Sequence, residues 1–216
     1  MKKFFYLVAG LALAMTMINI DVDARSKKVK ISQEQKMAQD PNRKTIRAWG
    51  MYEDFATMNL EAFAAMNARA SLAEQTAVLV SRALELYANS KNVAGINERG
   101  REDSARALQQ NAENQTKSVA KEIIQNSRVL QSTRYEVSKR SSLQVCYAVV
   151  EISIKDVLIN IKNTKKIKEA LDELESGLTG NPAAKLDINS SEFEKSMEKS
   201  FEELKEGKLV ISNMNL

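Results

Sequence analysis

The clearest pattern in the sequence is a long run in which apolar residues recur three and four positions apart. The run extends from about Asp54 to Tyr87, contains no glycine or proline, and is rich in residues that favour helices. The spacing predicts one long helix with an inward stripe formed by Leu60, Phe63, Met66, Ala70, Ala73, Ala77, Val80 and Leu84. Because alanine side chains are small, we expect this helix to lie close against a sheet, and we expect Ala70→Glu to unfold the protein.

The pattern changes to alternation in the second half of the chain. Leu143–Ile154 has apolar residues on both faces, which is typical of a central strand, and Val129–Val137 is rich in β-branched and aromatic residues. A polar turn at 139–142 joins these two segments and predicts an antiparallel hairpin. With a short strand at Thr45–Gly50, the sequence predicts an α+β fold in which the long alanine-rich helix packs on a small antiparallel sheet, with additional C-terminal helices.

Further helical patterns cover about Asp103–Gln125 and Lys155–Leu174. We expect one α+β envelope domain over 45–176, then a linker over 177–189 marked by glycine and proline, then a C-terminal amphipathic helix and tail over 190–216. Ser191 and Glu194 fit a capping box at the start of that helix. Its apolar stripe either packs back on the domain or binds a partner in trans, and consists of Phe193, Met197, Phe201 and Leu204.

The N-terminus has the pattern of a secretory signal. Lys2 and Lys3 precede an apolar stretch of about fifteen residues, and Ala24 ends a cleavage-site pattern, so we expect a cleaved signal peptide over 1–24. A polar, basic segment without periodicity follows over 25–44 and predicts an extended arm. The single cysteine, Cys146, is far from the cleavage site, so no cysteine is available there for a lipid. These features predict a periplasmic or envelope location.

Composition excludes several kinds of chemistry. The chain has no histidine and one cysteine, which removes the usual nucleophile triads and the ordinary zinc sites. No phosphate-binding glycine loop is present, and adjacent carboxylates on a helix point apart. A net charge of +4 without interleaved basic and aromatic residues does not indicate nucleic-acid binding. We therefore expect no enzyme, with no catalytic, cofactor-binding or metal-binding residues, and we expect Cys146 to be a core residue.

Three segments together resemble a known family. They are Arg47-Ala48-Trp49-Gly50, the alanine-rich helix with Ala68-Arg69-Ala70, and the hairpin through Tyr147-Ala148-Val149-Val150. This order of elements resembles the bacterial lipoprotein 20 envelope family over roughly 46–161. Members of that family carry an N-terminal lipid on a cysteine, and this chain has no cysteine at that place. The resemblance implies an α+β envelope domain and carries over no catalytic residues.

The sequence thus predicts an exported, non-enzymatic envelope protein that acts as a structural or interaction module. Two alternatives stay open. One is a helical minor-pilin-like subunit of a secretion or conjugation apparatus, which would contain little strand. The other is a periplasmic protein that binds a small ligand or lipid between helix and sheet near Trp49. The expected partners are an envelope protein or a second copy of the chain, with peripheral membrane contact also open and no nucleic acid.

Overall fold

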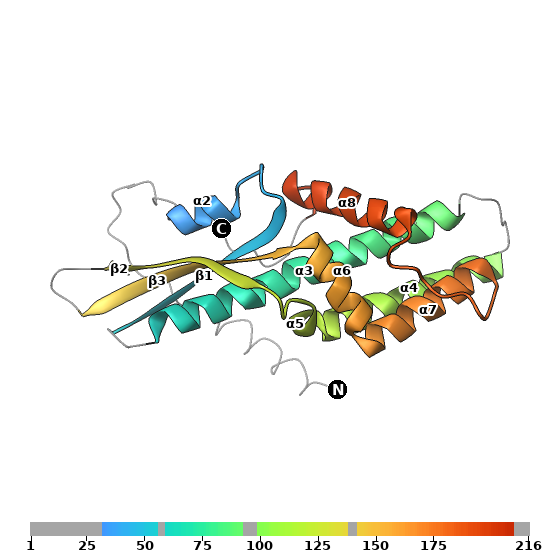
Figure 1. Ribbon diagram of the computed structural model, residues 1–216, viewed down its shortest axis with the longest axis horizontal. Helices are drawn as coiled ribbons and strands as arrows, with labels where there is room; N and C mark the ends of the chain where they lie inside the picture. Colours follow the sequence, from blue (N-terminus) through green and yellow to red (C-terminus); the bar gives the residue numbers. More distant parts are fainter. Residues whose placement is uncertain (1–31, 56–58, 93–98, 138–141, 210–216) are drawn as a thin grey trace, which may run out of the picture. The chain divides into compact units, whose positions relative to one another are not determined.

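The computed structural model describes residues 32–55, 59–92, 99–137 and 142–209. The predicted signal peptide, residues 25–31 of the predicted arm, residues 139–141 of the predicted turn and residues 210–216 of the predicted tail lie outside these ranges. The described residues form α-helices and a three-stranded antiparallel sheet (Figure 1). The predicted α+β fold is therefore confirmed.

The sheet consists of β1 (Thr45–Phe55), β2 (Arg128–Glu136) and β3 (Leu143–Ser153) in the order β1-β3-β2. Both pairings are antiparallel, which confirms the predicted hairpin and the central place of its second strand. Strand β1 is longer than predicted because it continues through Gly50 instead of ending there. The residues after Gly50 thereby become part of the sheet.

The long helix α3 (Leu60–Asn92) packs directly on one face of this sheet. Strand and helix are in close contact at Gly50, where a Cβ atom would lie 2.2 Å from the backbone nitrogen of Ala68 and 2.6 Å from the carbonyl oxygen of Ala64. Only glycine fits this contact, because the atoms opposite belong to the helix backbone. Gly50 therefore does not end β1 but is the residue at which β1 touches α3.

This close contact also fixes which side of α3 faces the sheet, and it contradicts part of the predicted stripe. Phe63, Met66 and Ala70 are exposed, with Met66 57% accessible. The N-terminal half of the helix buries a small-residue side instead, formed by Leu60, Ala64, Ala65, Ala68 and Leu72. The expectation that Ala70→Glu unfolds the protein is therefore wrong.

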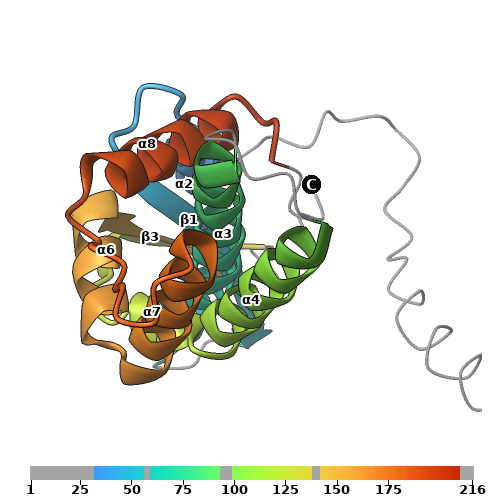
Figure 2. The ribbon, with the colours of Figure 1, turned by 90° about the vertical axis from the view of Figure 1, so that its right-hand side faces the viewer.

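The C-terminal half of α3 lies among the remaining helices, α4 (Arg99–Ser118), α5 (Ala120–Ile123), α6 (Ile154–Asn163), α7 (Lys165–Thr179) and α8 (Ser191–Lys205) (Figure 2). Two predicted helices are each divided in the structure, one at Val119 and one at Thr164, whose ψ of 104° is extended. The shared core at this end includes Leu79, Leu84, Ile161, Leu171, Leu174 and Phe193.

Helix α8 begins one residue earlier than its predicted capping box. Ser190 is the N-cap, and its hydroxyl accepts a hydrogen bond from the backbone N–H of Phe193 at 3.3 Å. Leu186 and Ile188, in the predicted linker, are buried in the same core as the rest of the helices. The segment before α8 is therefore packed against the domain.

The predicted extended arm contains a short helix, α2 (Gln33–Ala38). Ser32 and Gln35 form a capping box, in which the Ser32 hydroxyl accepts from the Gln35 N–H and the Gln35 side chain accepts from the Ser32 N–H. For residues 32–38 the prediction of an extended segment is therefore wrong. The helix lies on the sheet face opposite to α3 (Figure 1).

Candidate functional site

The sheet face turned away from α3, called the outer face below, carries the odd-numbered residues of β1 and β3. Helix α2 covers one part of it and inserts a fully buried glutamate, Glu34. Gln131 and Tyr135 donate hydrogen bonds to its carboxylate at 3.0 and 3.2 Å. Burial alone would raise the pKa of Glu34, but these donors and Thr133 outweigh it and the pKa lies below its usual value.

A second buried carboxylate, Glu151, lies on the same face. It accepts hydrogen bonds from Arg47 at 3.0 Å, from Arg128 at 2.6 Å and from Thr45 at 2.9 Å. Burial would raise its pKa, but the three donors on the two neighbouring strands hold the pKa below its usual value. Glu151 is thus hydrogen-bonded to side chains on both neighbouring strands, and these charged hydrogen bonds join the three strands.

At the other end of the outer face, no helix among the residues that the structure describes covers the sheet. The exposed or half-buried side chains there come from all three strands, and we call them the uncovered patch: Met51, Phe55, Tyr135, Val137, Leu143, Val145 and Tyr147. The strand register makes them neighbours, since Met51 is paired with Tyr147, Phe55 with Leu143, and Tyr135 with Val145. Phe55 is 63% and Val137 51% accessible, which is unusual for large apolar residues gathered on one surface.

Trp49 lies on the outer face at the border of the uncovered patch, with its ring centroid 6.2 Å from that of Tyr147. It is half-buried and points away from α3. Its neighbour Gly50 packs directly on the α3 backbone, which offers no support for a ligand between helix and sheet at that point. The ligand site near Trp49 stays a prediction. Trp49 can also contribute to binding on the outer face.

The apolar stripe of α8 is not a surface for a partner. Phe193, Met197, Phe201 and Leu204 are all buried in the helical core. The helix is held against α3 by Ser200, whose hydroxyl donates to the carbonyl of Leu79 at 2.7 Å, and by an ion pair of 2.7 Å between Arg82 and Glu203. Of the two interpretations of this stripe, the structure confirms packing on the domain itself.

Two side chains with potential reactivity, Cys146 and Tyr87, are buried. The thiol of Cys146 is fully buried against α3, and burial raises its pKa, which confirms its prediction as a core residue. The hydroxyl of Tyr87 donates to the carboxylate of Glu175, and burial together with this hydrogen bond raises the pKa of Tyr87 far above its usual value. Neither group is available as an anionic nucleophile at neutral pH.

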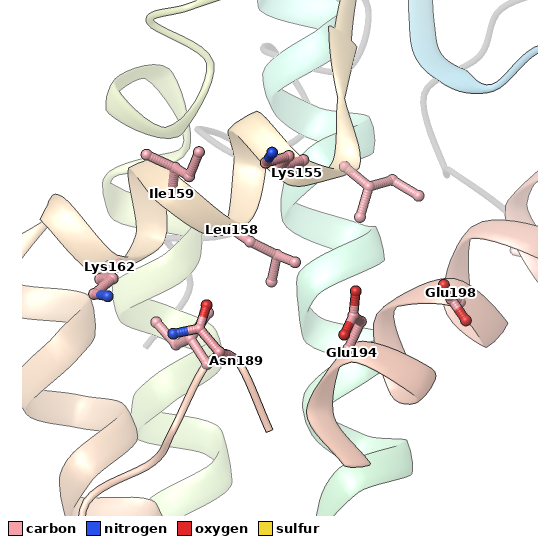
Figure 3. Close-up of a pocket in the computed structure, with 9 residues that line it drawn as sticks. Lys155, Leu158, Ile159, Lys162, Asn189, Glu194 and Glu198 are labelled. Atoms are coloured by element: carbon pink, nitrogen blue, oxygen red, sulfur yellow. The ribbon is translucent and has the colours of Figure 1, made fainter. Parts of the chain in front are cut away.

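A groove that the sequence did not predict lies between α6 and α8 and has a volume of about 540 Å³ (Figure 3). Lys155 and Lys162 lie on the α6 side, and Glu194 and Glu198 lie on the α8 side. Apolar side chains lie between them, namely Ile154, Leu158, Ile159 and Ile188. The groove joins segments separated in sequence, so no local motif could have indicated it.

Two further features are absent from the described ranges. No group of three or more histidine, cysteine, aspartate or glutamate side chains is arranged to hold a metal ion among the residues that the structure describes. Within that part of the chain, no helix is both long and apolar enough to cross a membrane. No protein-family model, curated protein or solved structure matches the chain, so the resemblance to the lipoprotein 20 family stays a prediction.

Proposed function

We propose that this protein is an exported, non-enzymatic interaction module of the bacterial cell envelope that binds another envelope protein through the uncovered patch. The observation that carries the proposal is the patch itself. Large apolar side chains from three neighbouring strands lie together on an exposed sheet face, next to a part of that face that α2 covers. Apolar patches of this kind mark surfaces that bind other molecules.

The patch also indicates what its partner carries. Glu53 is exposed on the outer face between Met51 and Phe55, opposite Val145 on the central strand. A partner surface that buries the patch must therefore be apolar and must place a cationic side chain opposite Glu53, because an unpaired buried carboxylate is costly. Tyr135 and Tyr147, with ring centroids 5.8 Å apart, supply the aromatic contacts that dominate such interfaces.

The alternative functions are less well supported. A helical pilin-like subunit would have little strand, whereas the described residues of this chain form a three-stranded sheet. A ligand between helix and sheet would need space that the packing of α3 fills. The location in the envelope rests on the N-terminal sequence pattern, and the absence of enzymatic activity rests on composition.

Site-specific photocrosslinking in envelope preparations of the source bacterium tests the proposal. A photoreactive phenylalanine analogue replaces Phe55 in the patch, and in a matched control it replaces Lys168, an exposed residue of α7. We expect a discrete crosslinked product of higher mass from position 55 only. The product should disappear when Met51→Ser and Val137→Ser are added, since both side chains are exposed in the patch. No product from position 55, an equal product from position 168, or a product that survives the two serine substitutions would overturn the proposal.

A further inference from the structure

The groove between α6 and α8 has opposite charges on its two walls that do not pair with each other. Lys155 and Lys162 lie two helical turns apart on α6, and Glu194 and Glu198 lie one turn apart on α8 (Figure 3). Among the described residues, no ion pair or hydrogen bond involves any of these four side chains. Apolar side chains also line the groove.

An occupant of this groove must satisfy three conditions at once. It must be apolar at its centre, because Leu158 and Ile188 form the floor, and Ile159 is 42% accessible at the rim. It must present cations to the acidic wall and anions to the basic wall. Other surface glutamates of the described chain do pair with basic side chains, as Glu192 does with Lys91 at 2.9 Å.

The chain itself meets these conditions. Helix α6 of one copy carries the exposed Ile159 and the cations Lys155 and Lys162, which can lie opposite the acidic wall of a second copy. In the same way, α8 of the second copy supplies the anions that lie opposite the basic wall of the first. A two-fold axis parallel to the groove places each basic wall opposite the acidic wall of the other protomer. A two-fold axis across the groove would instead place like charges together. A surface with one basic and one acidic wall is therefore self-complementary in a single orientation.

From this complementarity we infer that the α6/α8 groove is a self-association surface, in which two copies of the chain pair about a two-fold axis parallel to the groove. Each protomer contributes the apolar rim of α6 and both charged walls. The inference goes beyond the proposed function, since it uses neither the uncovered patch nor the outer face. A dimer formed in this way leaves both uncovered patches available for other partners.

Charge reversal with rescue tests the inference on the purified chain beginning at Arg25. Sedimentation equilibrium should show a concentration-dependent dimer whose dissociation constant rises with salt. Lys155→Glu with Lys162→Glu should raise that constant at least about tenfold, and so should Glu194→Lys with Glu198→Lys. An equimolar mixture of the two variants should again form a dimer, because each pairing then joins an acidic wall to a basic one.

A charge-matched control distinguishes pairing of the groove walls from a general effect of net charge. Lys166→Glu with Lys168→Glu, on the exposed side of α7, changes the net charge as much as the reversal of the basic wall does and should leave the dimer unchanged. Circular dichroism verifies that each variant is folded. A monomer at every concentration, a dimer that tolerates either groove reversal, or a mixture that stays monomeric would overturn the inference. Substitutions in the uncovered patch should not affect this dimer, so the two proposals fail independently.

Discussion

Replacing Gly50 by alanine tests the packing of the sheet on α3. The added Cβ would lie 2.2 Å from the Ala68 nitrogen, 2.6 Å from the Ala64 oxygen and 2.7 Å from the Asn67 carbonyl carbon. All three atoms belong to the helix backbone, so no side-chain rotation can relieve the overlap. The helix must move away from the sheet by about 1 Å to restore ordinary contact, which loses a quarter to a half of the dispersion attraction across the interface.

The loss of stability depends on which buried side chains lose contact when α3 moves away from the sheet. Ala48, Ala64, Ala68, Leu72 and Ala148 have no accessible surface and lie at this interface. We expect Gly50→Ala to lower the free energy of unfolding by about 3 kcal/mol or more, at the upper end of the usual cost of overpacking a core. For a chain of this length the melting temperature should fall by roughly 6–12 °C. Thermal and urea unfolding followed by circular dichroism measure both quantities.

Gly177→Ala is the matched control. Its Cβ would lie 2.1 Å from the Leu108 Cδ1 atom, an overlap as short as that at Gly50, but this atom is the end of a flexible side chain. Because Gly177 lies within α7, alanine also gains about 0.5–1 kcal/mol of helix propensity. The two variants should therefore differ by several kcal/mol. Equal stabilities, or a Gly50→Ala protein as stable as the wild type, would refute the reasoning from backbone contact.

Two further predictions concern the orientation of α3 and the buried carboxylate. Ala68→Glu should unfold the protein because Ala68 is buried against the sheet. Ala70→Glu, two residues away but exposed, should change the free energy of unfolding by no more than about 0.5 kcal/mol. Similar melting curves for the two variants would contradict the orientation of α3. Glu151→Gln should cost roughly 2 kcal/mol at pH 7, because it weakens charged hydrogen bonds to Arg47 and Arg128. Since the pKa of Glu151 is lowered below 4.5 in the folded protein, its contribution is complete above about pH 4.5 and is lost as the pH falls through the folded value. Urea unfolding should thus show the difference between wild type and variant shrinking toward pH 3, and a constant difference would argue against the ion cluster.

Periodicity is sufficient to predict the sheet and most helices, but not the rotation of α3. The predicted stripe places large residues such as Phe63 and Met66 inside because they are the most hydrophobic. Close contact with Gly50 instead selects the smallest side chains, Ala64 and Ala68, and turns the large ones outward. A glycine in an alternating strand near alanines spaced four apart is the signal that could have indicated this.

The candidate site is harder to predict from the sequence. A strand that ends at Gly50 leaves Met51 and Phe55 out of the sheet, and with them half of the exposed side chains of the uncovered patch. The capping box of Ser32 and Gln35 is present in the sequence and predicts α2 by itself. The groove between α6 and α8 depends on how two helices pack, which local patterns do not encode.

The position of β3 between β1 and β2 has a consequence for the order in which the chain folds. Thr45 and Glu151 are hydrogen-bonded although they lie 106 positions apart in the sequence. Pairing β1 with β3 therefore requires closure of a long loop. During synthesis from the N-terminus, β1 emerges long before its partner strand. Helix α3 is the next element after β1 and can cover the inner face of β1 soon after it is made. The edge of β1 that pairs with β3 stays unpaired until β3 has been made. During this interval the unpaired edge of β1 can pair with a wrong strand or bind a chaperone that recognises exposed strands.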